Sequence, residues 1–137
     1  MEKPKFNLKS IPLKKNSNGE FIGHLINCMG VTKMYMITTD SYVVHKQCHH
    51  FLENTHCHLY CLAKQLTVEE GKLSGFGSYS LQEYESTDPL EYFKGLKSYI
   101  ESQRENAYKD ADHTITSEIN SILKNVNNFI YHVQQMK

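Results

Sequence analysis

The histidine and cysteine side chains that could do chemistry are concentrated in one stretch of the sequence, residues 45–61. Of the eight histidines and four cysteines in the chain, eight lie there: His45, Cys48, His49, His50, His56, Cys57, His58 and Cys61. Imidazole nitrogens and thiolates are the side-chain ligands that zinc and other transition metals prefer. A metal site or a catalytic site is therefore sought first in this stretch.

The geometry of these residues depends on the secondary structure that carries them. Residues 56–68 read as a β-strand, on which successive side chains face opposite sides. His56 and His58 then share one face, about 7 Å apart. Cys57 and Cys61 share the other face, and we expect them to be small core side chains rather than metal ligands.

A helix over residues 41–53 would bring a second pair of histidines to the same site. Asp40 and Ser41 are residue types that cap helix N-termini. Apolar residues follow at helical spacing: Val44, Cys48, Phe51 and Leu52. His45 and His49 would then lie one turn apart on the polar face. A strand over residues 42–47 is the alternative, because tyrosine and paired valines favour extended backbone.

The predicted metal site combines the two pairs of imidazoles, His45, His49, His56 and His58. Such a set suits zinc or another transition metal. With an open coordination position, the metal would acidify a bound water for hydrolysis, and Glu53 would act as base or fourth ligand. The competing interpretation is that these histidines are exposed on polar faces and bind no metal. No complete catalytic motif is present, so the sequence leaves open whether the protein is an enzyme.

Strand and turn signals dominate the first 40 residues. Asn18-Gly19 is a strong signal for a two-residue hairpin turn, so we expect residues 5–15 and 20–28 to pair as strands. Residues 31–39 read as a third strand. An antiparallel meander is therefore predicted at the N-terminus.

A second predicted hairpin joins residues 56–68 to residues 73–84 through a turn at residues 69–72. Gly75 and Gly77 fall inside the return strand, where glycine indicates a bulge or a close approach to the backbone. A small ligand in a pocket between sheet and helices would use that space.

The C-terminal part, residues 88–136, has a helical pattern. Asp88, Pro89 and Glu91 are an N-cap acid, a proline at the first helical position and a glutamate at the third. Further on, apolar residues recur at steps of four and three: Ile115, Ile119, Ile122, Val126, Phe129 and Val133. Polar residues 102–106 and 109–112 separate this stripe from an earlier one, which favours a helical hairpin. One unbroken helix of about 70 Å is the alternative, because the apolar phase continues at 3.6 residues per turn.

Charge and hydropathy narrow the classes of protein. Fifteen basic and fifteen acidic side chains cancel, and Arg104 is the single arginine. This balance of charges, with a single arginine, does not favour a nucleic acid as partner. The sequence has no apolar run of ~18 residues and no signal-peptide pattern, so we expect a soluble cytoplasmic protein that has reduced thiols and no membrane partner.

Together these patterns predict a single α+β domain over residues 1–137. An antiparallel β-sheet over residues 5–85, with one short inserted helix, precedes two long C-terminal α-helices. The favoured function is a non-catalytic binding or assembly protein that self-associates through its C-terminal helices, as a dimer, and binds a protein partner or small ligand. The alternative is a metal-binding protein or metal-dependent hydrolase that uses the four histidines. No other cofactor is expected.

Overall fold

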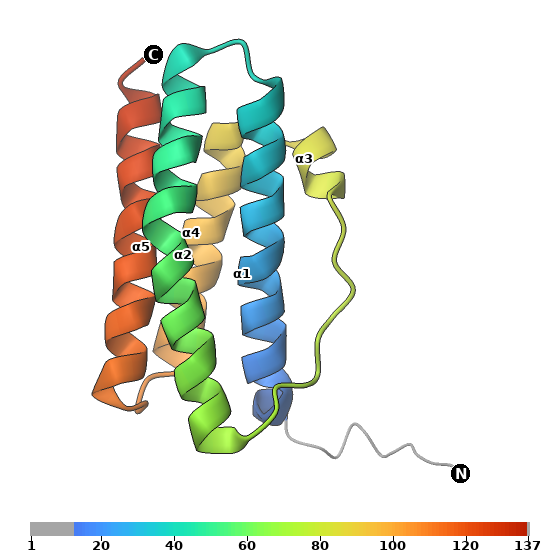
Figure 1. The fold of residues 1–137 in the computed structure, drawn as a ribbon, viewed down its shortest axis with the longest axis vertical. Helices are drawn as coiled ribbons and strands as arrows, with labels where there is room; N and C mark the ends of the chain where they lie inside the picture. The colour runs from blue at the N-terminus through green and yellow to red at the C-terminus, as the bar shows by residue number, and fades with distance from the viewer. Residues whose placement is uncertain (1–12, 137) are drawn as a thin grey trace.

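The structure, a computed structural model, describes residues 13–136 of the chain. Over this range the chain forms five α-helices: α1 (Leu13–Thr38), α2 (Tyr42–Glu70), α3 (Gln82–Ser86), α4 (Pro89–Asn106) and α5 (His113–Gln134). The four long helices lie side by side as a bundle, and the short α3 lies beside α1 near one end (Figure 1). None of these helices is long and apolar enough to cross a lipid bilayer.

Buried and mostly apolar residues at steps of three and four explain the first two helices. In α1 these buried residues are Phe21, Leu25, Cys28, Thr32 and Tyr35. In α2 they are Val44, Cys48, Phe51, Thr55, Leu59, Leu62 and Leu66. Such a spacing places all members of each set on one side of a helix, where they face the core. The predicted cap is confirmed, because the Ser41 hydroxyl accepts the backbone N–H of Val44 at 3.1 Å.

The C-terminal helical hairpin is confirmed. The Asp88 carboxylate accepts the backbone N–H of Glu91 at 2.9 Å, and Pro89 is the first residue of α4. The chain turns at residues 107–112, and the Asp112 carboxylate caps α5. The alternative prediction of one unbroken helix through this region is therefore wrong.

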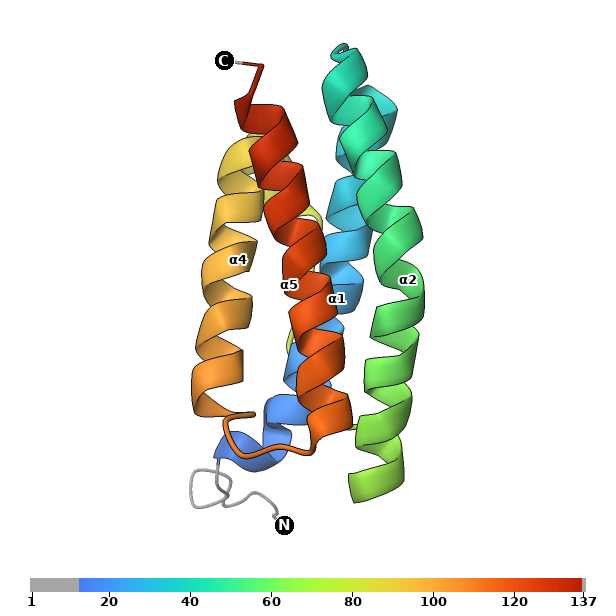
Figure 2. The same ribbon diagram turned by 90° about the vertical axis from the view of Figure 1, so that its left-hand side faces the viewer.

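The four long helices alternate in direction around the bundle. As Figures 1 and 2 show, α1 and α5 run toward one end, whereas α2 and α4 run toward the other. Each of the pairs α1–α2, α2–α5 and α4–α5 is therefore antiparallel and packed side by side. Phe93 of α4 is central to the core, because its ring stacks on Phe129 of α5 at 3.7 Å and meets Phe51 of α2 edge-on at 5.0 Å.

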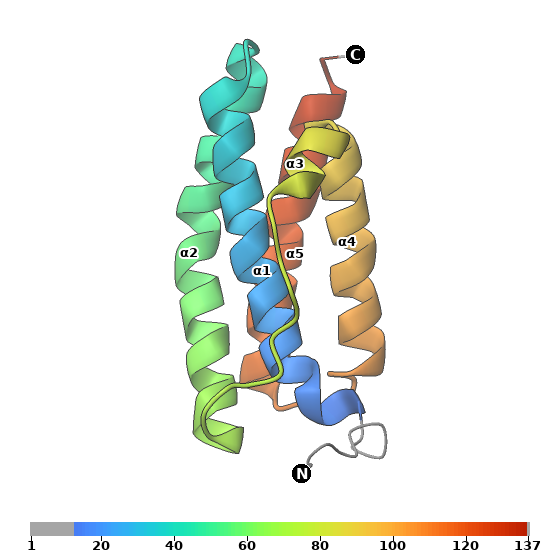
Figure 3. The same ribbon diagram turned by 90° about the vertical axis from the view of Figure 1, so that its right-hand side faces the viewer.

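A long connection, residues 71–81, returns the chain along the outside of α1 from one end of the bundle to the other (Figure 3). Glycines of α1 allow this close approach. A Cβ atom on Gly19 would lie 1.7 Å from the carbonyl oxygen of Ser74, and one on Gly23 would lie 2.7 Å from the ring of Tyr79. The Tyr79 hydroxyl also donates to the carbonyl oxygen of Glu20 at 2.7 Å, which fastens the connection to the helix.

The predicted α+β class and its antiparallel sheet are wrong, because no residue between 13 and 136 is in a β-strand. Residues 20–28 and 31–38 belong to α1, and residues 56–68 belong to α2. The Asn18-Gly19 pair lies inside α1, where Gly19 serves packing rather than a turn. Residues 5–12 of the predicted first strand lie outside the described residues.

The predicted return strand at residues 73–84 is also wrong. Its residues form the extended connection and the start of α3. Gly75 has a φ of 81°, a left-handed conformation that glycine adopts without strain. A Cβ on Gly77 would lie 3.4 Å from the Tyr79 hydroxyl, so this backbone approaches the chain's own side chain.

Candidate functional site

The four histidines of the predicted metal site all lie on α2, but they face two sides of it. Residues 45, 49 and 56 share one face, because they are separated by four and seven positions on a helix. His58 faces α5, where its Nδ1 atom lies 2.6 Å from the carboxylate of Glu118. The imidazole of His58 is therefore engaged in a contact between α2 and α5 and faces away from the other three.

Of the remaining three histidines, His49 and His56 line one groove, and His45 and His49 each contact a different neighbour. The Nδ1 atom of His45 lies 3.0 Å from the carbonyl oxygen of Met36. The His49 ring lies 3.7 Å from the carboxylate of Glu53, and both side chains are largely exposed. Within the described part of the chain, no group of three or more His, Cys, Asp or Glu side chains is placed to hold a metal ion. The structure does not bring the four predicted ligands together.

The cysteines divide into two exposed and two buried thiols. Cys57 and Cys61 are exposed, whereas Cys28 and Cys48 are buried. Burial raises the pKa of both the Cys28 and Cys48 thiols to about 12. The expectation that Cys57 and Cys61 point into the core is wrong. It assumed strand alternation, whereas on a helix positions 57 and 61 lie on the outer side, away from Leu59 and Leu62.

The apolar stripe of α5 lies inside the bundle. Its six members are between 0 and 3 % exposed: Ile115, Ile119, Ile122, Val126, Phe129 and Val133. Their surface is covered by packing against α2 and α4. Apolar surface for a second molecule must therefore come from another part of the bundle.

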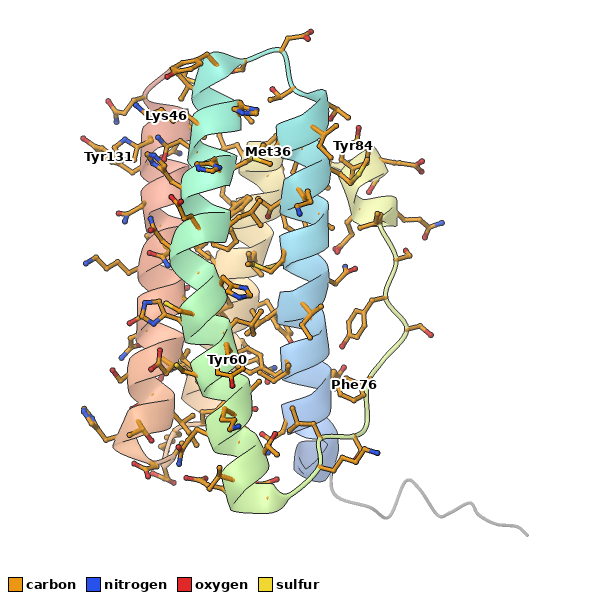
Figure 4. All side chains as sticks on the ribbon, viewed as in Figure 1. Met36, Lys46, Tyr60, Phe76, Tyr84 and Tyr131 are labelled. Carbon is orange, nitrogen blue, oxygen red and sulfur yellow. The ribbon has the colours of Figure 1, made fainter. Side chains whose placement is uncertain are left out.

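Such a surface exists on the outer side of α1 and α2. We call it the α1–α2 face and define it by six side chains: Ile26, Met29, Met36, Ile37, Leu52 and Tyr60. Ile26, Ile37 and Tyr60 are 57, 64 and 61 % exposed. Figure 4 shows Met36 and Tyr60 on this side of the bundle. Large apolar side chains gathered on one surface typically mark an interaction site.

A groove of about 520 Å³ lies in the middle of the α1–α2 face. Met29 and Met36 of α1 and Leu52 of α2 supply its apolar lining. Lys33 of α1 and Glu53 of α2 contribute one charge of each sign. Methionine side chains are flexible and polarizable, so they adapt to the shape of an apolar partner.

Half of the residues that line this groove are ionisable: Lys33, His49, Glu53 and His56. No serine, threonine or cysteine lines the groove in the described part of the chain. What the groove offers is apolar contact bordered by charge.

Sequence reasoning missed the α1–α2 face because α1 was interpreted as strands. A signal was available in the spacing of Ile26, Met29, Met36 and Ile37, which differ by three, seven and one. These positions form a second apolar stripe on a helix, next to the one that faces the core.

Comparison of the chain with models of protein families, with curated proteins and with solved structures gave no match.

Proposed function

We propose that the protein is a non-catalytic assembly protein that dimerises through the α1–α2 face. The supporting observation is the exposure of Ile26, Ile37 and Tyr60 around one apolar groove. Burying these side chains against a second copy removes apolar area from water, which stabilises association by about 25 cal/mol per Å² before the entropy of association is subtracted.

The outer side of α1 and α2, which contains the α1–α2 face, is large enough for a stable dimer. The helices α1 and α2 contain 26 and 29 residues, and at 1.5 Å per residue each is about 40 Å long. Two helices packed side by side are about 20 Å wide. The whole outer side of the two helices therefore measures about 800 Å², the area per partner of a standard stable interface, and the α1–α2 face is the apolar part of that side.

The charges on the face favour a second copy as the partner. A two-fold symmetric interface pairs the same two surfaces, so each residue i meets residue j of the other copy and the reverse. Lys33 and Glu53 border the groove from different helices. In an antiparallel dimer, Lys33 of each copy can meet Glu53 of the other, which fixes the orientation without leaving either charge unpaired.

The experiment is to measure mass in solution by sedimentation equilibrium for the full chain and for two variants. We expect the unmodified protein to be a dimer at tens of micromolar. Ile37→Lys and Tyr60→Lys should each shift it to monomer, because a lysine at the interface must be desolvated. The control is Tyr131→Lys on α5, a side chain of similar exposure, 59 %, which should leave the dimer intact.

A charge exchange tests the orientation separately. Lys33→Glu should weaken the dimer, and the double variant Lys33→Glu with Glu53→Lys should restore it. A monomeric unmodified protein, or a dimer that survives both lysine substitutions, would contradict the proposal.

A further inference from the structure

Cys57 and Cys61 form a pair of exposed thiols in the middle of α2. They are four positions apart, so they lie one helical turn apart on the same side of the helix, with about 5–6 Å between their Cβ atoms. Cys61 follows His58 by three residues, and His58 contacts Glu118 of α5. Cys61 therefore lies toward the α5 side of the outer surface, and neither thiol belongs to the α1–α2 face.

The packing of α2 fixes the spacing of this pair. Thr55, Leu59 and Leu62 come from the same two turns of the helix, and all three are buried. Side chains in a close-packed core do not shift without losing contacts. The backbone that carries the two thiols is therefore held in helical form before any ligand binds.

The spacing does not suit a disulfide between the two cysteines. A disulfide requires Cβ atoms about 3.5–4.5 Å apart, which is shorter than the about 5–6 Å that one helical turn provides. Closing such a bond would distort α2 where its buried side is packed. Both residues are free cysteines.

The same spacing suits a single metal ion placed between the two sulfur atoms. Two metal–thiolate bonds of about 2.3 Å, the length found for zinc, span about 4.6 Å when they lie in line. Rotation of the two side chains brings the sulfur atoms to this span from Cβ atoms about 5–6 Å apart. The helix therefore does not have to change for both sulfurs to bind one ion.

The number of ligands selects the kind of metal. Structural zinc is almost always held by four protein ligands, and the described part of the chain places no group of three or more His, Cys, Asp or Glu side chains around one point. Copper(I) is a soft ion that prefers thiolates, and two of them in a linear arrangement complete its coordination. A pair of thiols without further ligands therefore favours copper(I) over zinc.

The charges beside the pair suit such a complex. Copper(I) bound by two thiolates is an anion. Lys64 is exposed and follows Cys61 by three residues, which places its ammonium group within reach of the complex. Glu53 precedes Cys57 by one turn, but its carboxylate lies 3.7 Å from the ring of His49, in the direction away from the thiols. The neighbouring cation therefore balances the charge of the complex.

We propose that Cys57 and Cys61 bind one copper(I) ion between their sulfur atoms. Both thiols release their protons to the solvent when the bonds form, because the thiolate is the form that binds a metal. The site shares no residue with the α1–α2 face, so it does not depend on dimerisation through that face.

The experiment is a competition, in the absence of oxygen, between the reduced full chain and the coloured copper(I) chelator bicinchoninate. We expect each chain to withdraw one copper(I) ion from the chelator, and X-ray absorption to report two sulfur ligands at the metal. An excess of zinc should not displace the copper. Sedimentation equilibrium should give the same mass with and without copper, because both ligands come from one chain.

Variants of the cysteines test the pair and its spacing. Cys57→Ser and Cys61→Ser should each abolish the withdrawal of copper, although the buried Cys28 and Cys48 remain in both proteins. The spacing control combines Cys57→Ser with Asn54→Cys, at an exposed position. Its thiols at positions 54 and 61 lie about 10 Å apart along the helix, which is too far for one ion, so binding should be lost although the number of exposed thiols is unchanged.

A charge reversal tests the neighbouring cation. Lys64→Glu should weaken copper binding about tenfold, the lower value for a group that supports metal ligands without binding the metal. The matched control is Lys46→Glu, an exposed lysine of the same helix that lies eleven positions before Cys57. It should leave the affinity unchanged.

Four outcomes would overturn the proposal. These are a failure of the unmodified chain to withdraw copper, undiminished binding by a folded Cys61→Ser protein, equal binding by the spacing control, and a doubling of mass on addition of copper. Circular dichroism of each variant separates loss of binding from loss of fold.

Discussion

Cys57 and Cys61 lie one helical turn apart on the outside of α2, whereas Cys28 and Cys48 are enclosed by the core. A thiol reacts as its thiolate, so access and pKa together decide its reactivity. The two buried thiols lack access, and their pKa is raised to about 12. Four residues of one type should therefore behave as two chemically distinct pairs.

We predict that a disulfide reagent such as Ellman's reagent modifies two thiols quickly in the folded protein at pH 8, and the other two only after unfolding. Cys57→Ser and Cys61→Ser should each remove one fast equivalent, whereas Cys48→Ser should remove none. Fewer than two fast equivalents in the folded chain would mean that residues 57 and 61 are enclosed.

Residue types alone did not place these side chains. The sequence correctly singled out residues 45–61 as rich in histidine and cysteine, but direction depends on the backbone period. On a strand, His56 and His58 share a face, whereas on α2 they lie on nearly opposite sides and His58 pairs with Glu118. Assuming the two-residue period of a strand, in place of the 3.6-residue period of a helix, therefore put His58 into the predicted metal site by mistake.

At the level of helices, local capping signals were reliable and glycine signals were not. Ser41 and Asp88 were identified as N-caps from sequence, and both side chains accept a backbone N–H in the structure. Capping depends on contacts within one turn, so the sequence contains all that is needed. Gly19 was misinterpreted, because its partner, Ser74, is 55 positions away and no local pattern reveals it.

Gly19 provides a direct test of how the connection packs on α1. We predict that Gly19→Ala lowers the free energy of unfolding by about 1–3 kcal/mol, the usual effect of forcing extra atoms into a packed site. The methyl group would overlap the carbonyl oxygen of Ser74, so the connection must move. Urea unfolding followed by circular dichroism measures the change.

The matched control is Gly95→Ala, where the added methyl group meets no atom within 4 Å. It should raise the free energy of unfolding by up to about 1 kcal/mol through helix propensity alone. If both substitutions raised the free energy of unfolding, the connection would not be packed tightly against α1 at Gly19.

For the molecule as a whole, the apolar stripe of α5 was found correctly, but its partner could not be deduced from sequence. A heptad-like stripe packs equally well against another copy or against helices of the same chain. The earlier helices of the chain decide the outcome, and these were interpreted as strands. With α2 and α4 beside it, α5 has its apolar surface covered within one chain.

We predict that Ile122→Lys or Phe129→Lys unfolds the bundle instead of separating subunits. Both native side chains are 1 % exposed, and an unpaired buried charge costs several kcal/mol. Far-UV circular dichroism should show a large loss of helix for both. Ile37→Lys, at an exposed position, should retain the helical signal, and a folded monomeric Ile122→Lys protein would instead identify the stripe as a subunit interface.

Residues 71–81 join the two helix pairs covalently, but packing between helices holds the pairs together. The pair α1–α2 and the pair α4–α5 are each continuous in sequence, and sideways packing of α2 on α5 joins them. A single cut in the exposed backbone near Ser78 would leave every one of these helix–helix contacts in place. The nicked halves would therefore remain one particle, and two separately synthesised fragments contain what is needed to reassemble it.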